Sequence, residues 1–312
     1  MTRTEREDDR PLVWLPFDPA DLDDAGGAPD GLRYEVVDPT ESVPDSVEQV
    51  RLYVPPYRTD PAAAEVMARM SSLEVVQTLT AGVDNLLDAV PDGVTLCSGR
   101  GIHDASTAEL VLTLVLASLR GVPGFVRAQD RATWAFEWRP ALADKHVVVV
   151  GAGAIAQAVE QRVRPFEAEV TLVGRTARDD VRGIEDLPAL LPQADVVVLV
   201  VPLTDETRGL VDADFLRAMR PGALLVNAAR GAVVDTDALV EALREERVLA
   251  ALDVTDPEPL PDGHPLWGCP GLLVTPHVGG ASSAMWPRAH RLVSGQLHRW
   301  AAGEDLWNVV GG

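Results

Sequence analysis

The chain has 312 residues, of which 46% are hydrophobic and 24% charged, so it can form two globular domains with buried cores. Its formal net charge of -21 repels DNA, RNA and anionic membrane surfaces, and we expect neither nucleic acid nor a membrane as a partner. The start, MTRTEREDDR, lacks the apolar core of a signal peptide, and no apolar run nears the roughly 20 residues of a membrane helix. These features predict a cytoplasmic protein.

The few cysteines and the single lysine limit the kinds of metal site and of lysine-dependent reaction that the chain can support. Cys97 and Cys269 are far apart and lack the spacing of metal ligands, so we expect both to be reduced and structural, and we expect no metal. Lys145 is the only lysine and directly precedes an apolar run. Reactions that need a Schiff-base or phosphate-loop lysine therefore have one poorly placed candidate.

Apolar runs alternate with helical patterns through the first third of the chain, which predicts a small, flavodoxin-like doubly wound domain. The expected strands are 11–17, 32–37, 50–55, 73–79 and 94–98, and the expected helices are 61–70 and 84–90. From Ser106 a long, almost wholly apolar helix follows, TAELVLTLVLASLRG, which is either central core or a subunit contact.

A segment rich in tryptophan follows this helix. The sequence RATWAFEWRP, residues 131–140, places Trp134 and Trp138 where a monomer surface poorly explains them. Aromatic side chains are enriched at interfaces, so we predict a homodimer. Core packing is the alternative for Trp138.

A second series of apolar runs predicts a parallel sheet that is buried on both faces. The runs are 146–150, 169–174, 195–202, 223–229, 249–254 and 272–277, with helices starting near Ala154, Leu187, Ala213 and Thr236. After one more helical stretch, the tail LWNVV is expected to return to the first domain. We therefore predict a domain at 1–99, an inserted Rossmann domain at 100–283, and a returning segment at 284–312.

The motif GAGAIA, residues 151–156, follows the run HVVVV and precedes a helical pattern. Gly151 permits a tight turn, and Gly153 lets the backbone approach a pyrophosphate. Ala154 and Ile155 then begin a helix whose N-terminus faces the phosphates. This context predicts dinucleotide binding, with a structural glycine turn as the alternative.

The acidic residue that normally ends the second strand and binds the adenosine ribose is absent. The strand reads EVTLVGRTAR, with Gly174, Arg175 and Thr176 in that region. Arg175, together with Arg178, can bind a 2'-phosphate through charge-assisted hydrogen bonds. We predict that NADP(H) is preferred and that NAD(H) is possible; the alternative is that Arg175 is a solvated loop residue.

Three further motifs place an arginine, a glutamate and a histidine at successive strand ends. They are NAARG at 227–231, DVTDPEP at 253–259 and TPHVGG at 275–280. Open parallel sheets bind ligands at this edge. Reduction of a 2-oxo acid needs a cation for the carboxylate, a proton donor for the carbonyl group, and an acid that tunes this donor.

Together with TAGVDNL, which begins at Thr80, these motifs resemble the D-isomer-specific 2-hydroxyacid dehydrogenases over nearly the whole chain. GRT after the second strand and DVTDPEPLPDGHPL are most similar to the glyoxylate and hydroxypyruvate reductases, many of which use NADPH. The resemblance implies a substrate domain, an inserted Rossmann domain, and hydride transfer between a nicotinamide cofactor and a small 2-oxo acid.

The resemblance also implies a catalytic role for each of three residues. Arg230 would bind the substrate carboxylate and carbonyl oxygen. His277 would be the general acid, and Glu258 would pair with it and raise its pKa. Individually, Glu258 could be a turn acid and Arg230 could cap a loop; their joint position at strand ends argues for the site.

Further contacts follow from the same likeness. Asp253 matches the acid that hydrogen-bonds the nicotinamide carboxamide, and Ala228 lies at the strand end below the ring. Pro202 and Thr207 belong to the loop beside the cofactor ribose, and Gly279 is a further expected cofactor contact.

In the first domain, Ala81, Gly82 and Val83 match a turn whose backbone N–H groups hold the substrate carboxylate, with an ordinary glycine turn as the alternative. Arg58 and Arg100 are pocket candidates that are equally explained as surface arginines.

Two other classes of protein remain open. One is a non-catalytic NAD(P)-sensing protein of the same fold, and the other is an enzyme that oxidises formate or phosphite. The resemblance implies glutamine at the position of Glu258 in formate oxidation, so Glu258 argues against that chemistry. The resemblance implies that residues 131–140 wrap a partner subunit, and it makes Trp138 a candidate to reach the partner's active site. Glyoxylate, hydroxypyruvate, phenylpyruvate and longer 2-oxo acids all fit the site.

Overall fold

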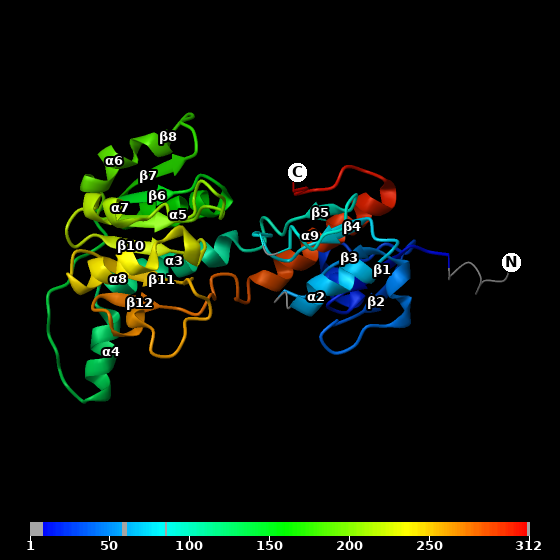
Figure 1. Ribbon diagram of the computed structural model, residues 1–312, viewed down its shortest axis with the longest axis horizontal. Helices are drawn as coiled ribbons and strands as arrows, with labels where there is room; N and C mark the ends of the chain where they lie inside the picture. Colours follow the sequence, from blue (N-terminus) through cyan, green and yellow to red (C-terminus); the bar gives the residue numbers. More distant parts are fainter. Residues whose placement is uncertain (1–8, 58–60, 85, 311–312) are drawn as a thin grey trace. The chain divides into compact units, whose positions relative to one another are not determined.

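The computed structural model describes residues 9–57, 61–84 and 86–310. The chain divides into two compact units (Figure 1). Unit 1 comprises the described parts of Met1–His103 and Ser283–Gly312, and unit 2 is Asp104–Ser282. Each unit is built on its own parallel sheet, so the protein belongs to the α/β class.

The sheet of unit 1 has the strand order β2-β1-β3-β4-β5, with every pair parallel. This is the flavodoxin-like order, as predicted. Its strands, β1 (Leu12–Leu15), β2 (Arg33–Val36), β3 (Val50–Tyr53), β4 (Val75–Gln77) and β5 (Thr95–Cys97), all lie within the expected ranges.

Helices cover both faces of this sheet because successive strand residues point to opposite sides. The face that carries Val13 and Leu15 packs against α9 (Met285–Ala302), and the face that carries Trp14 packs against α2 (Pro61–Glu65) and its 3-10 extension. The C-terminal tail lies along the sheet, where the N–H of Val310 donates to the carbonyl of Leu96.

The expected helix at 84–90 is wrong. Its described residues form turns, in which the N–H of Leu86 donates to the carbonyl of Val83. Leu86 is buried and Ala89 and Val90 pack on the same core, but the hydrogen bonds donated by Leu86 and Ala89 span three residues, as in turns. The segment is too short for helix propensity alone to stabilise an α-helix.

The sheet of unit 2 has the order β12-β11-β10-β9-β6-β7-β8, again all parallel (Figure 1). When β6 is taken as the first strand, the strands from β8 to β11 have the Rossmann order 3-2-1-4-5-6, and β12 is one added strand at the edge. Its strands are β6 (His146–Val150), β7 (Glu169–Gly174), β8 (Val181–Gly183), β9 (Val196–Leu199), β10 (Leu224–Asn227), β11 (Leu249–Leu252) and β12 (Leu272–Val274). Strand β8 was not predicted, since it has only three residues and an exposed arginine.

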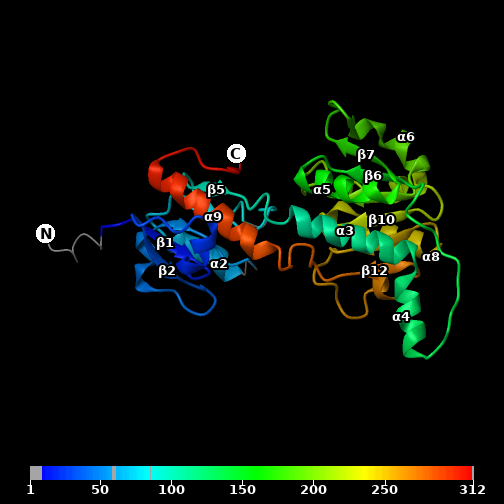
Figure 2. The ribbon, with the colours of Figure 1, turned by 180° about the vertical axis from the view of Figure 1, so that it is seen from behind.

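Four helices of unit 2 begin at the predicted residues. They are α5 (Ala154–Val163), α6 (Leu187–Leu190), α7 (Ala213–Ala218) and α8 (Thr236–Arg244). The carboxylates of Asp212 and Asp235 accept hydrogen bonds from the first turns of α7 and α8, and each such cap stabilises its helix by about 1 kcal/mol. Helices α3 (Asp104–Leu119) and α5 pack on one face of the sheet, and α6, α7 and α8 on the other (Figure 2).

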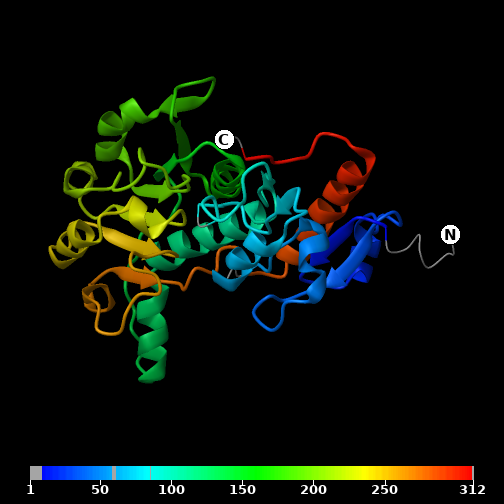
Figure 3. The same ribbon diagram turned by 45° about the vertical axis from the view of Figure 1, so that its right-hand side comes forward.

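Helix α3 ends at a sharp bend of 66°, and α4 (Val122–Asp130) continues from it (Figure 3). Gly121 adopts a left-handed conformation at the bend. Beyond α4, residues 131–140 are exposed throughout, and Trp134 and Trp138 are 96% and 88% exposed. Among the described residues, no single helix is long and apolar enough to cross a membrane; α3 and α4 pass that test only as a bent pair.

Candidate active site

The glycine turn at the end of β6 leads directly into the N-terminus of α5. Gly151 has φ of +131°, and a Cβ there would lie 2.7 Å from the carbonyl oxygen of Val200, so only glycine fits. Gly153 is the extended N-cap of α5, and Ala154 begins the helix. The N-terminal N–H groups of a helix are suited to a phosphate group, so this turn fits a dinucleotide.

The loop after β9 has a fixed shape. The hydroxyl of Thr207 donates to the carbonyl of Pro202 over 2.7 Å and accepts from the N–H of Thr204 over 2.8 Å. Next to it, the N–H of Ala228 donates to the carbonyl of Leu199 over 3.1 Å. The expected cofactor residues Pro202, Thr207 and Ala228 therefore follow neighbouring strands of one sheet.

The end of β7 carries cations where many dinucleotide-binding proteins have an acid. Gly174 ends the strand, and Arg175 is 82% exposed, with Nη1 3.8 Å from a carboxylate oxygen of Glu206. The guanidinium of Arg178 donates to the carbonyl of Ala152 over 3.2 Å. This last contact links the arginine to the glycine turn, and it could not be predicted from the sequence because it joins two separate loops.

Arg230 lies in a tightly packed loop after β10. The amide group of Asn227 donates to the carbonyl of Arg230 and accepts from the N–H of Ala229, both over 3.0 Å. A Cβ on Gly231 would lie 1.9 Å from the carbonyl oxygen of Thr255, so this glycine allows the loops after β10 and β11 to touch. The roles of Asn227 and Gly231 were missed from sequence because both depend on this loop contact.

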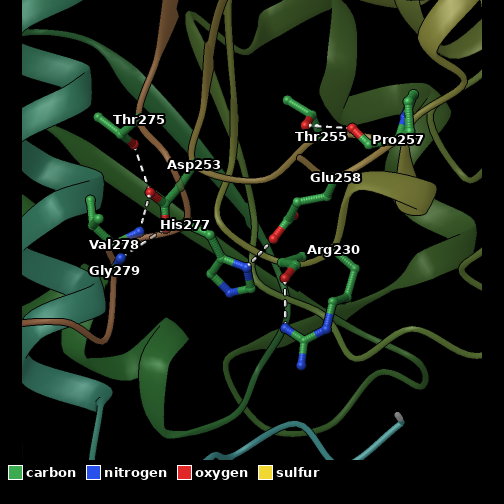
Figure 4. A network of polar contacts seen from close by, with 10 residues as sticks. Arg230, Asp253, Thr255, Pro257, Glu258, Thr275, His277, Val278 and Gly279 are labelled. Carbon is green, nitrogen blue, oxygen red and sulfur yellow. Dashed lines mark hydrogen bonds and ion pairs between the residues drawn. The ribbon is translucent and has the colours of Figure 1, made fainter. Parts of the chain in front are cut away.

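His277 and Glu258 form a close pair (Figure 4). Nδ1 of His277 lies 2.6 Å from Oε1 of Glu258, and the side chains are 46% and 41% exposed. The hydrogen bond to Glu258 raises the pKa of His277, against the opposing effects of partial burial and of Arg230. The same hydrogen bond lowers the pKa of Glu258. The pair is therefore an ionised carboxylate that holds an imidazole with increased proton affinity.

Asp253 follows β11 and is only 3% exposed. Its carboxylate accepts hydrogen bonds from the hydroxyl of Thr275 and from the N–H groups of Val278 and Gly279, over 2.6, 2.9 and 2.9 Å (Figure 4). These contacts within the chain were also missed from sequence, because the motif spacing does not reveal which groups the acid faces.

Other residues that the sequence singled out are a turn histidine, the turn at residues 81–83 and Arg100. Nδ1 of His264 accepts from the N–H of Leu266, as expected for a turn residue. In unit 1, the described residues include no acceptor for the N–H groups of Ala81, Gly82 and Val83. Arg100 is exposed.

Two further points concern expected sites. Arg58 lies outside the described residues. The described part of the chain contains no cluster of three or more histidine, cysteine or acidic side chains that could hold a metal ion.

The chain is similar to known proteins of one family. Residues 112–279 match the family model of the D-isomer specific 2-hydroxyacid dehydrogenase NAD binding domain. The chain is 33% identical to a glyoxylate reductase of Thermofilum pendens, over 79% of this chain and 77% of that one. It is also 33% identical to the glyoxylate reductase/hydroxypyruvate reductase of Homo sapiens, over 76% of each chain.

A solved structure extends the likeness to the whole fold. The D-isomer specific 2-hydroxyacid dehydrogenase of Xanthobacter autotrophicus Py2, solved in complex with NADPH and MES, is 33% identical, with a TM-score of 0.81. The match covers 97% of this chain and 98% of that one. The chain therefore belongs to the D-isomer-specific 2-hydroxyacid dehydrogenase family and is an NAD(P)-dependent oxidoreductase.

Proposed function

We propose that this enzyme reduces a small 2-oxo acid, such as glyoxylate or hydroxypyruvate, to the D-2-hydroxy acid, with NADPH as the preferred hydride donor. The observation that carries the proposal is the 2.6 Å contact between His277 and Glu258, beside Arg230. A cation and a proton donor supported by an acid are the groups that this reduction needs.

His277 is the general acid. Its Nδ1 faces Glu258, so its Nε2 is left to donate a proton to the carbonyl oxygen of the substrate (Figure 4). NADPH, when bound, supplies the hydride to the carbonyl carbon. His277 then becomes neutral, and Glu258 stays ionised because its pKa is low. The next turnover requires one proton from solvent.

Arg230 binds the substrate carboxylate and the carbonyl oxygen. Its guanidinium is permanently charged and lies near enough to His277 to lower the pKa of that histidine. One of its nitrogens, Nη1, donates to the carbonyl of Ala229 over 2.9 Å, which fixes the direction of the side chain. That the N–H groups of residues 81–83 bind the carboxylate stays a prediction.

The glycine turn and the neighbouring strand ends hold the cofactor. Gly151, Gly153, Ala154 and Ile155 would hold the pyrophosphate, and the groups after β9 and β10 would hold the nicotinamide riboside. These last groups are Pro202, Thr207 and Ala228. The open space around Gly153 and the exposed N-terminus of α5 support this assignment.

The preference for NADPH rests on the end of β7. The strand end is formed by Gly174, Arg175 and Thr176, none of which has a carboxylate. The cations at this strand end are Arg175 and Arg178. A 2'-phosphate would form charge-assisted hydrogen bonds with them. We expect a higher kcat/KM with NADPH than with NADH, and a clear NADH preference would contradict this assignment.

We also propose a homodimer, in which residues 131–140 cover a partner subunit. The exposure of Trp134, Phe136 and Trp138 supports it, because large apolar side chains are seldom left in water. Light scattering at micromolar concentration tests this point: a monomer would contradict it. Residence in the cytoplasm stays a prediction.

Turnover tests the proposed function. We expect the oxidation of NADPH to depend on a 2-oxo acid when the enzyme is given glyoxylate, hydroxypyruvate, phenylpyruvate and longer homologues, and chiral analysis to identify the D product. Cofactor binding without turnover of any of these acids would instead favour a non-catalytic NAD(P) sensor.

A further inference from the structure

Two threonine hydroxyl groups in unit 1 bond to the backbone beside the turn at residues 81–83. They belong to Thr78 and Thr80, in the segment that follows β4. Thr78 is 1% exposed, and Thr80 is half-buried. Both hydroxyl groups donate to carbonyl oxygens of this segment, so they act on the shape of its backbone.

The hydroxyl of Thr78 holds the carbonyl group of Thr80. It donates to that carbonyl oxygen over 2.8 Å, and the N–H of Gly99 donates to the same oxygen over 2.7 Å. Gly99 lies in the loop after β5, and a Cβ there would lie 2.7 Å from the carbonyl carbon of Leu79. Glycine therefore lets the two loops come this close, and the carbonyl of Thr80 is held by both.

The hydroxyl of Thr80 in turn holds the carbonyl group of Gly82, to which it donates over 2.8 Å. The next carbonyl, that of Val83, accepts from the N–H of Leu86 over 2.9 Å. Leu86 is buried in the core of unit 1. The end of the turn is thus fixed to the core as well.

The start of the segment is held by two buried side chains. The amide group of Gln77 donates to the carbonyl of Thr78 over 2.8 Å, and Nε2 of His103 donates to the carbonyl of Leu79 over 2.7 Å. The carbonyl groups of residues 78, 79, 80, 82 and 83 therefore all accept hydrogen bonds within the chain. Few peptide units of this segment are left to rotate.

Each fixed carbonyl group determines where an N–H group points, because a trans peptide unit is planar and its C=O and N–H point in opposite directions. The carbonyl of Thr80 shares its peptide unit with the N–H of Ala81, and the carbonyl of Gly82 shares its unit with the N–H of Val83. Among the described residues neither N–H group has an acceptor, and both residues are partly exposed. The two N–H groups are thus fixed in direction and left for an acceptor from outside the chain.

We propose that Thr78 and Thr80 are positioning residues for the substrate: their hydroxyl groups orient the peptide units whose N–H groups bind the carboxylate of the 2-oxo acid. Donors that are fixed before the substrate arrives bind it more tightly than donors that must first be ordered. The inference rests on the proposed reduction of a 2-oxo acid and on the predicted role of residues 81–83.

The variant Thr80→Val tests the proposal because valine keeps the β-branched shape of threonine and removes only the hydroxyl. The carbonyl of Gly82 then loses its donor, and the N–H of Val83 is no longer fixed. We expect KM for the 2-oxo acid to rise about tenfold, with kcat and the Kd for NADPH nearly unchanged, because the lost interaction binds substrate and transition state alike. Thr80→Ser keeps the hydroxyl and should keep KM within about twofold of the unchanged enzyme.

The matched control is Thr113→Val on the exposed side of α3, where the hydroxyl donates to the carbonyl of Glu109 in the same helix. It makes the same chemical change away from the turn and should leave KM and kcat as they are. Equal KM values in T80V and T113V would overturn the proposal. A fall in kcat at unchanged KM would overturn it too, because the hydroxyl would then not act on substrate binding.

Thr78→Val should have a smaller effect than T80V. When the hydroxyl of Thr78 is removed, the carbonyl of Thr80 keeps its hydrogen bond from the N–H of Gly99, so the N–H of Ala81 stays partly fixed. We expect KM to rise about threefold. A larger rise in T78V than in T80V would contradict the order that these hydrogen bonds imply.

Hydrogen exchange of the cofactor-free protein gives a readout that does not depend on turnover. In T80V the amide of Leu86, which donates to the carbonyl of Val83, should lose protection. The amide of Thr78, which donates to the carbonyl of Cys97 over 2.8 Å, should keep its protection.

The exchange experiment separates a failure of this inference from a failure of the proposed function. Unchanged protection of Leu86 in T80V would overturn the inference, whether or not a 2-oxo acid is reduced. Lost protection in an enzyme that reduces none of the 2-oxo acids would count against the proposed function and leave the orienting role of the hydroxyl groups in place.

Discussion

Two ends of the same sheet edge in unit 2 differ in how firmly their charged groups are held. At the end of β7, Arg175 is 82% exposed and its nearest acid is 3.8 Å away. At the ends of β11 and β12, Asp253 is 3% exposed and His277 lies 2.6 Å from Glu258. Recognition of an anion needs charge and tolerates motion, whereas proton transfer needs fixed atoms. The two ends should therefore respond differently to substitution.

His277→Gln should have the largest effect, because it removes the proton donor. We expect kcat for 2-oxo acid reduction to fall by about 100- to 10,000-fold, with cofactor binding intact. Steady-state kinetics and the fluorescence of bound NADPH measure the two quantities. His264→Gln is the matched control, since that histidine caps a turn elsewhere in unit 2; full activity in H277Q would refute the assignment.

Arg230→Gln should lower kcat/KM for the 2-oxo acid by about 100-fold, because a carboxylate would lose two charge-assisted hydrogen bonds. Arg230 also lowers the pKa of His277, so its removal should move the alkaline limb of kcat to higher pH. The exposed Arg244 provides the control, Arg244→Gln. An unchanged kcat/KM would show that another group binds the substrate.

Glu258→Gln should move the pH profile in the opposite direction. The pKa of His277 is raised mainly by Glu258, so without this carboxylate it falls, and the histidine is deprotonated at lower pH. Reduction requires the protonated form, and its alkaline limb therefore shifts to lower pH, with a loss of about tenfold above neutrality. The control is Glu241→Gln on the exposed side of α8. A limb that stays in place would separate Glu258 from the proton donor.

Arg175→Ala should have the smallest effect. We expect kcat/KM with NADPH to fall about tenfold and kcat/KM with NADH to stay unchanged, because an exposed arginine contributes a modest interaction. Arg182→Ala, at another exposed arginine close by on β8, is the control. Equal losses with both cofactors would mean that Arg175 does not contact a 2'-phosphate.

Much of the fold could be predicted because local and long-range preferences agree. Apolar runs such as HVVVV are buried on both faces of a parallel sheet, and helices start where the pattern changes, at Ala154, Leu187, Ala213 and Thr236. The helix expected at 84–90 is absent because this short segment closes as turns, although Leu86, Ala89 and Val90 pack on the core. Strand β8 was missed because it is short and half polar.

The site could be predicted in part. The motifs led to Arg230, Glu258 and His277, and the structure brings the last two into contact. The sequence could not show that Asp253 faces the segment of His277, nor that Gly231 touches Thr255. These contacts join residues from different loops, and only the packing of the strands brings them together.

A double-mutant cycle of His277 and Glu258 tests most directly whether these residues act as one proton donor. The kcat for NADPH-dependent glyoxylate reduction is measured for the unchanged enzyme, H277Q, E258Q and the double variant. If Glu258 acts through His277, the double variant is as slow as H277Q alone. Losses that multiply would contradict the account, because they would give the glutamate a role independent of the histidine.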